Sequence, residues 1–188
     1  MIAEAIKDYG VLLAGPMGTG APEFKSPRIA FNGSVNCGHQ ENSSIVIPWP
    51  SEDATGVATE GEDAIAGQWF AGATLHTRVC NGDCSYETFA IDRVFQLEKW
   101  QEPDENGLYF DCCKTAFRPY DLAVTAVLLI ARHHLGDAFQ VSSDGSDRQW
   151  SDTKLLCYSR LGFGTEYRMD DHAGLVMSVA PEMQSLVD

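Results

Sequence analysis

The sequence predicts an α+β protein in which an N-terminal antiparallel meander with a hairpin is joined to a C-terminal βαβα unit with a buried central helix. Short β-branched and aromatic runs recur through residues 27–100, as in strands. Residues 107–162 are patterned as strand, helix, strand and helix, and the segment 122–131 is apolar on nearly every side, which is typical of a buried helix. A helix that joins two strands directly favours a parallel, right-handed crossover, so we expect a mixed sheet.

The length and composition fit one domain. Of 188 residues, 44% are hydrophobic and 10% are aromatic, which is enough apolar material for a core. We expect a single domain over residues 1–188, divided into a flexible segment at 1–26, a β-rich part at 27–100, a βαβα part at 107–162 and a tail at 175–188.

The N-terminal segment is predicted to be a short helix followed by a flexible glycine-rich loop. The spacing from Gly15 to Gly20 resembles the start of a phosphate-binding loop. Ala21 and Pro22 replace the lysine and the hydroxyl residue that such a loop uses to contact phosphates and magnesium, so the motif is incomplete.

The β-rich part is predicted to contain two short strands and one hairpin. The strands are expected at 28–31 and 44–47, where β-branched and aromatic residues cluster. The segments 69–80 and 85–95 are predicted to pair with each other. The connection at 81–83, Asn-Gly-Asp, tolerates the positive φ angles of a tight hairpin turn.

The helix expected over residues 122–135 has the clearest local signals. Asp121 is expected to cap its N-terminus, where a carboxylate also opposes the positive end of the helix dipole. The basic residues 132–134 lie in the last turn, and Gly136 can end the helix in the left-handed conformation.

Strands are expected on either side of that helix, at 108–114 and 139–142. A second helix is predicted over 148–161, with Asp147 as its N-cap and Gly162 as its stop. If the two strands are parallel, the loops that follow them share one edge of the sheet, where α/β proteins usually bind ligands.

The first candidate site is this edge. Lysine and arginine could hold an anionic group there, while hydroxyls and carboxylates bind the rest of a ligand. Glu87 shares a strand face with apolar residues and is expected to pair with Lys114 or Arg118. Salt bridges and helix caps use the same residue types, so a purely structural network is the alternative. The candidate ligand-binding residues are Lys114, Thr115, Arg118, Tyr120, Asp121, Ser142, Ser143, Asp144, Asp147 and Glu87.

The second candidate site is a set of thiols and one imidazole in the β-rich part. Structural zinc takes four such ligands, and Cys37, His39, Cys80 and Cys84 can supply them. The Cys-x3-Cys spacing is looser than that of the usual zinc knuckle, and the second pair is only Cys-x-His. Ordinary reduced thiols in strands are therefore the competing interpretation, and no cofactor other than this zinc ion is expected.

The net charge limits the classes of partner that the protein can bind, and the N-terminal sequence indicates the cellular compartment. The net charge is −14, which disfavours nucleic acid and anionic lipid surfaces, because binding to both relies on lysine and arginine. No secretory signal and no membrane-spanning apolar run are visible. We therefore expect a cytoplasmic protein whose six cysteines are reduced.

Four short motifs carry a resemblance to known sequences. They are residues 31–33 (Phe-Asn-Gly), 87–89 (Glu-Thr-Phe), 113–121 (with Lys-Thr-Ala and Pro-Tyr-Asp) and 142–145 (Ser-Ser-Asp-Gly). Through them the chain resembles small uncharacterised proteins encoded by bacteriophages and in bacterial genomes. The resemblance implies an origin in phage or mobile DNA and supplies no catalytic residues.

Three functions are consistent with the sequence. The leading hypothesis is a binding protein that engages a host protein or a small anionic ligand through residues 114–121 and 142–147. The second is an enzyme acting on a small phosphorylated or nucleotide-like substrate at the same edge, which requires a concave pocket with an acid or base of perturbed pKa. The third is a zinc-stabilised interaction module built on the cysteine and histidine set.

Overall fold

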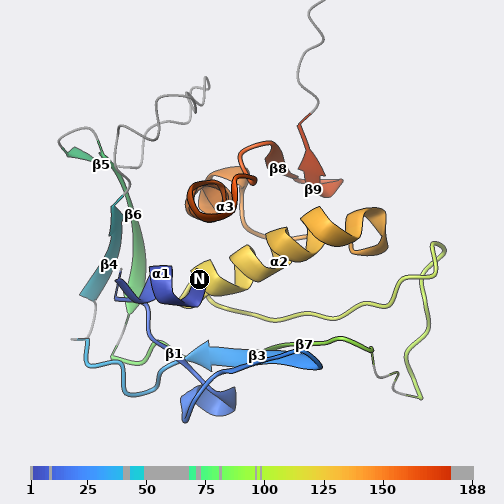
Figure 1. Ribbon diagram of the computed structural model, residues 1–188, viewed down its shortest axis with the longest axis horizontal. Coiled ribbons are helices and arrows are strands. Elements are labelled where there is room, and N and C mark those ends of the chain that lie inside the picture. The colour runs from blue at the N-terminus through green and yellow to red at the C-terminus, as the bar shows by residue number, and fades with distance from the viewer. Residues whose placement is uncertain are drawn as a thin grey trace, which may run out of the picture. The chain divides into compact units, whose positions relative to one another are not determined.

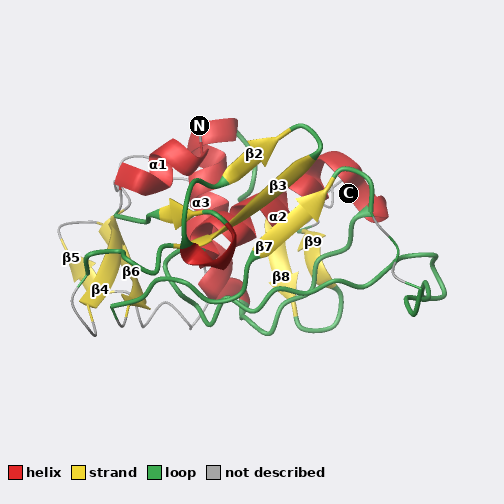
Figure 2. Cartoon of the chain, turned by 90° about the horizontal axis from the view of Figure 1, so that it is seen from below, coloured by secondary structure: helices red, strands yellow, loops and turns green. Residues whose placement is uncertain are grey.

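The computed structural model describes residues 2–8, 10–39, 43–48, 68–70, 73–80, 82–95, 97 and 99–178. These residues form helices and antiparallel sheets (Figures 1 and 2), which confirms the predicted α+β class. The chain divides into two compact units, residues 1–124 and 125–188, and each is described by itself. The single domain expected from the sequence stays a prediction.

The first unit contains a four-stranded antiparallel sheet centred on one strand, β3. Its order is β1–β3–β2, and β7 also pairs with β3. Phe31 lies opposite Phe89 with the ring centroids 5.2 Å apart, and Ile29 lies opposite Ile91. Cross-strand apolar pairs of this kind stabilise a sheet. The strands are β1 (Leu13–Ala14), β2 (Glu23–Lys25), β3 (Arg28–Gly33) and β7 (Phe89–Asp92).

The N-terminal segment, which was expected to be flexible, carries regular structure. It contains the helix α1 (Ile2–Asp8) and the 3-10 helix η1 (Pro16–Gly18) as well as β1 and β2. Ile6 and Val11 are almost fully buried, so the segment contributes to the core. Gly18 has φ +76°, and a Cβ there would lie 2.6 Å from the side chain of Val35. The glycine-rich stretch is therefore a tight packed loop.

A second sheet in the same unit has the order β4–β6–β5 and is antiparallel. Its strands are β4 (Ser43–Pro48), β5 (Gln68–Phe70) and β6 (Ala73–Cys80). The strand expected at 44–47 is thus present, as is the one expected at 28–31.

The predicted hairpin between 69–80 and 85–95 is wrong. The strand β6 pairs with β4 and β5, whereas β7 pairs with β3 in the other sheet. Between the two strands, the backbone N–H of Cys84 donates to the carbonyl oxygen of Ser34, just after β3, at 3.1 Å. Phe89 then finds its apolar partner, Phe31, on β3.

The strands expected at 108–114 and 139–142 are not formed, so the predicted βαβα unit is absent from the part of the chain that the structure describes. Each segment bonds to a different neighbour, and the two share no ladder. The carbonyl of Lys114 accepts from Glu87 at 3.3 Å, and that of Val141 accepts from Leu175 at 2.8 Å. Phe110 is 76% exposed, which is incompatible with a place in a buried strand.

The helix α2 (Asp121–Leu135) matches the helix predicted over 122–135 to within one residue. It begins in the first unit and continues in the second. Its first half is buried, from Asp121 to Ala126, whereas Leu135 is 57% exposed. Gly136 has φ +57° and begins the 3-10 helix η2 (Gly136–Ala138). Among the described residues no helix has the length and apolarity needed to cross a membrane.

The second unit also contains a short helix pair and a hairpin. The 3-10 helix η3 (Asp147–Trp150) leads into α3 (Ser151–Leu161), which ends at Gly162 in the left-handed conformation, as predicted. The strands β8 (Tyr167–Asp170) and β9 (Gly174–Met177) pair with each other. The predicted tail at 175–188 starts inside β9, and residues 179–188 lie outside the described residues.

The N-cap expected at Asp147 is provided by its neighbour. Ser146 forms a capping box with Gln149, in which each side chain bonds to the backbone N–H of the other residue. The Asp147 carboxylate instead accepts hydrogen bonds from Lys154 Nζ at 2.9 Å and from the Met169 N–H at 2.6 Å. Asp147 therefore joins α3 to β8 within the second unit.

Candidate metal centre

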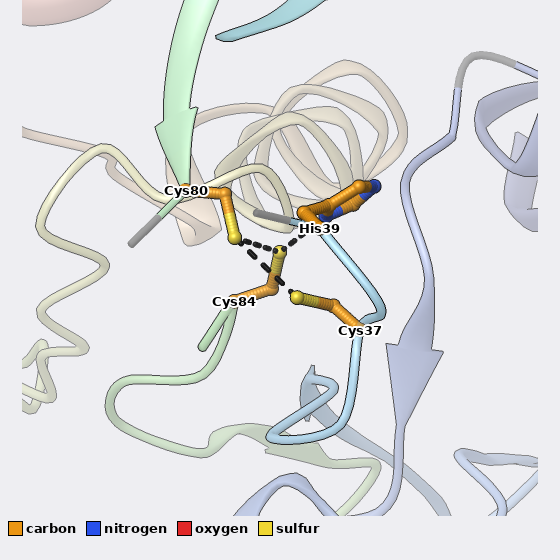
Figure 3. A group of neighbouring side chains, drawn as sticks. All are labelled: Cys37, His39, Cys80 and Cys84. Carbon is orange, nitrogen blue, oxygen red and sulfur yellow. Dashed lines mark hydrogen bonds between the residues drawn. The ribbon is translucent and has the colours of Figure 1, made fainter. Parts of the chain in front are cut away.

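Four side chains that the sequence singled out converge in the first unit: Cys37, His39, Cys80 and Cys84. One ligand atom from each lies within 4.8 Å of all the others. Figure 3 shows the three sulfur atoms grouped together with the ring of His39 beside them. The Sγ of Cys80 lies 3.4 Å from that of Cys37 and 3.2 Å from that of Cys84, and His39 Nδ1 lies 3.4 Å from Cys84 Sγ.

These separations are close to those of a tetrahedral metal site. With Zn–S bonds of about 2.3 Å and Zn–N bonds of about 2.0 Å, the ligand atoms around zinc are separated by about 3.5–3.8 Å. A disulfide requires about 2.05 Å between sulfurs, and the three thiols are free. The arrangement is therefore spaced for a shared metal ion and not for a sulfur–sulfur bond.

Two segments of chain deliver the four ligands. Cys37 and His39 lie in the loop that follows β3, and Gly38 between them takes φ +76°. Cys80 ends β6, and Cys84 lies four residues later, between Asp83 and Ser85, where the Asp83 carboxylate accepts the Ser85 N–H at 2.7 Å. The Cys84–Ser34 backbone bond holds the two segments together.

The three thiols are removed from water, with exposures of 6% or less. Burial raises the pKa of the Cys80 and Cys84 thiols, and at Cys84 the neighbouring sulfurs raise the pKa further. At Cys37 burial also acts to raise the pKa, but hydrogen bonds from the His39 backbone and from the other two thiols outweigh it and lower the pKa. A bound cation would offset the repulsion between thiolates held this closely.

Arg118 contacts the backbone next to Cys84. Its guanidinium Nη1 donates to the carbonyl oxygen of Asp83 at 3.0 Å. Partners that hold the backbone around a metal site are part of what sets its affinity. A residue expected to bind a ligand thus contacts the candidate metal loop.

A second link runs from β6 to the start of α2. Arg78, two residues before Cys80, is completely buried and lies 3.4 Å from the Asp121 carboxylate. Its guanidinium also lies over the ring of Phe117, 4.8 Å from the centroid. Ala116 and Phe117 adopt φ angles of +49° and +52°, which are unfavourable for residues with a side chain. The contact with Arg78 helps to hold them there.

Other residues of the expected ligand-binding loop are bonded within the first unit. Thr115 Oγ1 donates to Asp121 at 2.6 Å, and the Tyr120 hydroxyl donates to the Glu87 carbonyl at 2.7 Å. Burial, followed by the charges of neighbouring groups, raises the pKa of Tyr120, which keeps this donor protonated. Glu87 does meet Lys114, but its exposed carboxylate accepts the backbone N–H at 2.7 Å and not the ammonium.

The second half of the expected ligand-binding set lies in the second unit. Ser142, Ser143 and Asp144 are exposed, and Ser143 Oγ accepts the Gly145 N–H at 2.9 Å. Asp147 is bonded to Lys154 and Met169, as described above. The common edge of the two loops was inferred from parallel strands that are not formed among the described residues, so a site shared by the two loops stays a prediction.

Sequence reasoning identified the four candidate metal ligands and missed the residues that support them. Arg78 was not singled out, although its position two residues before Cys80 in a strand places both side chains on one face. A charged arginine in a strand, on the same face as a cysteine ligand, is the sequence signal that could have identified Arg78 as a supporting residue. Arg118 was singled out as a ligand-binding residue, and its contact with Asp83 depends on long-range folding.

No protein family model, curated protein or solved structure matches this chain. The resemblance to phage and bacterial proteins stays a prediction. The function is therefore inferred from the geometry of the metal centre and from the surfaces around it.

The vicinal thiols Cys112 and Cys113 are predicted to differ in reactivity. Burial, and then the charge of Glu87, raises the pKa of Cys113 to about 12, whereas Cys112 is exposed. Only thiolates are alkylated, so iodoacetamide at pH 8 should modify Cys112 at least about ten times faster than Cys113. Peptide mass spectrometry over a time course measures both rates, and equal rates would contradict the prediction.

Proposed function

We propose that this protein is a zinc-stabilised interaction module in which Cys37, His39, Cys80 and Cys84 hold one structural zinc ion. The convergence of four ligand atoms within 4.8 Å carries the proposal. Thiolate and imidazole ligands favour zinc over magnesium or calcium, which prefer oxygen.

The ligand count supports a structural role over a catalytic one. Catalytic zinc sites keep one position open for water or substrate, whereas structural sites use four protein ligands. Here four protein ligand atoms lie within 4.8 Å of one another, and the three cysteines are buried. Zinc in this place would act as a cross-link and not as a Lewis acid.

The cross-link would join the two sheets of the first unit. Cys37 follows β3 in the first sheet, and Cys80 ends β6 in the second. The buried side chains Cys37, Cys80 and Cys84 form their own core cluster. Thiols bury little apolar surface, so metal binding would contribute folding free energy that apolar packing does not supply at this junction.

A binding role fits the surroundings of the centre better than an enzymatic one. The side chains expected at an active edge, such as Thr115 and Tyr120, are engaged in internal hydrogen bonds. A cavity of about 390 Å³ in the first unit is lined by residues such as Arg28, Asp92 and Arg93, and by none of the expected ligand-binding residues. The net charge of −14 favours a protein partner over nucleic acid or a membrane, and intact thiolates require a reducing compartment such as the cytoplasm.

Cobalt substitution tests the proposed ligand set. Titration of the metal-free protein with Co²⁺ should give the intense visible absorption of tetrahedral thiolate ligation, saturating at one ion per chain. The Cys112→Ser variant is the matched control, because Cys112 is exposed and outside the cluster, and it should behave like the wild type. Weak absorption of the octahedral kind, or saturation unchanged in Cys80→Ser, would reject the proposal.

Arg118 is predicted to act as a positioning residue for the metal loop. Arg118→Ala removes the bond to the Asp83 carbonyl and should weaken zinc binding by about tenfold, as loss of an outer hydrogen bond does in other metal sites. Competition with a chromophoric chelator measures the affinity. Lys114→Ala removes a nearby exposed positive charge and should leave the affinity within about twofold, so an equal loss in both variants would indicate a charge effect only.

A further inference from the structure

The segment between β7 and α2 carries a concentration of exposed apolar side chains. Figure 1 shows it leaving the end of β7, extending beyond the sheet and returning to the start of α2. Trp100 and Phe110 are 77% and 76% exposed. The other large apolar side chains exposed there are Val94, Phe95, Leu97 and Tyr109. We refer to residues 93–111 as the aromatic loop.

The described part of the aromatic loop is ordered by its own contacts. Phe95 and Tyr109 stack with their ring centroids 5.8 Å apart and an interplanar angle of 27°. The Asp104 carboxylate accepts the N–H groups of Asn106 and Leu108 at 2.9 and 2.8 Å, which closes the turn at the tip. A surface that is ordered in advance loses less conformational entropy when it binds.

The aromatic loop is acidic as well as apolar. Its sequence holds two basic residues, Arg93 and Lys99, against five acidic ones, which gives a net charge of −3. The acidic residues are Glu98, Glu102, Asp104, Glu105 and Asp111. Glu102 and Glu105 are exposed, and neither forms an ion pair with another residue that the structure describes.

This charge restricts what can cover the apolar side chains. Nucleic acid and anionic lipid would be repelled, since both require positive charge on the protein. A second copy of the chain would bring another acidic loop and another net charge of −14, which disfavours self-association through this surface. A protein segment with lysine or arginine beside apolar side chains would complement both the negative charge and the exposed apolar side chains of the loop.

We propose that the aromatic loop is a docking surface for a basic, amphipathic segment of a partner protein. Trp100 and Phe110 are the apolar anchors, because large aromatic side chains dominate the energetics of interfaces. The face of Trp100 also attracts cationic side chains, and the acidic residues accelerate the encounter with a basic partner. This surface is independent of whether zinc occupies the metal centre.

The probe for this surface is a synthetic amphipathic helical peptide of leucine and lysine, with a leucine and glutamate counterpart as the charge control. Binding to the full chain, measured by anisotropy of a labelled peptide, should occur with the lysine peptide only. The variant Trp100→Ala/Phe110→Ala should bind at least about tenfold more weakly, the loss of two interface anchors. The matched control Tyr158→Ala/Met177→Ala removes two exposed side chains of the second unit and should bind within about twofold of the wild type, because neither side chain is an anchor of the proposed interface.

A second variant separates the charge from the apolar contacts. Glu102→Gln/Glu105→Gln should weaken binding of the lysine peptide by about threefold or more and reduce the salt dependence of that binding. Equal affinity of the wild type and Trp100→Ala/Phe110→Ala would overturn the proposal, as would equal affinity for the two peptides. Self-association of the wild type that Trp100→Ala/Phe110→Ala abolishes would assign the surface to a second copy and also overturn it.

Discussion

Replacing Cys84 with serine should abolish stoichiometric zinc binding and lower the thermal unfolding midpoint by at least about 10 °C. A structural zinc ion contributes several kcal/mol or more to folding, and each kcal/mol shifts the midpoint of a chain of this size by about 2–4 °C. Cys84 is 1% exposed and contacts both Cys80 and His39, so its replacement removes one of the four ligands from the centre of the set. Differential scanning calorimetry of the zinc-loaded proteins measures the shift.

Two controls separate metal loss from damage to packing. Cys112→Ser changes an exposed thiol and should leave the midpoint within about 2 °C, as surface substitutions usually do. Chelation of the wild type removes the metal without changing a side chain, and it should reproduce most of the fall seen in Cys84→Ser. A wild-type midpoint that is insensitive to a strong chelator would show that Cys84 acts through packing alone.

Replacing Arg78 with alanine should lower the free energy of unfolding by about 3–5 kcal/mol, the usual cost of removing one member of a buried ion pair. Arg78 is fully buried, and its loss leaves the Asp121 carboxylate without the nearby positive charge. The variant also removes the guanidinium that lies over the ring of Phe117, a residue whose backbone is in the left-handed conformation. Urea unfolding followed by circular dichroism gives the change.

The exposed pair in the same unit provides the comparison. Arg28 and Asp92 lie 3.1 Å apart with 43% and 35% of their side chains exposed, and Arg28→Ala should cost no more than about 1 kcal/mol. The double variant Arg78→Ala/Asp121→Ala should be less destabilised than the sum of the two single variants, because the interaction between the two side chains is lost only once. Strict additivity would contradict a direct coupling between Arg78 and Asp121.

Features with local causes were predictable from the sequence. The helix α2 and the stops at Gly136 and Gly162 depend on residues within a few positions of each other, and capping chemistry is readable at that range. The four candidate metal ligands were also identified, since three cysteines and a histidine close to one connection are the ligand types that structural zinc uses. Their convergence supplied the geometry that spacing alone could not.

Strand pairing was not predictable in the same way. Residues 69–80 and 85–95 have the pattern of a hairpin, but each finds a partner in a different sheet because apolar cross-strand contacts such as Phe31 with Phe89 decide the register. The supporting arginines are hidden for the same reason. Arg78 and Arg118 reach residues 43 and 35 positions away in sequence, so only the folded chain reveals what they contact.

Native mass spectrometry of the protein purified without added metal tests the zinc centre most directly. The folded protein should carry the extra mass of one zinc ion per chain, the denatured protein should lose it, and Cys84→Ser should lack it in both states. A native mass equal to the denatured mass, after purification in the presence of a reductant and without chelator, would contradict the proposed structural zinc ion.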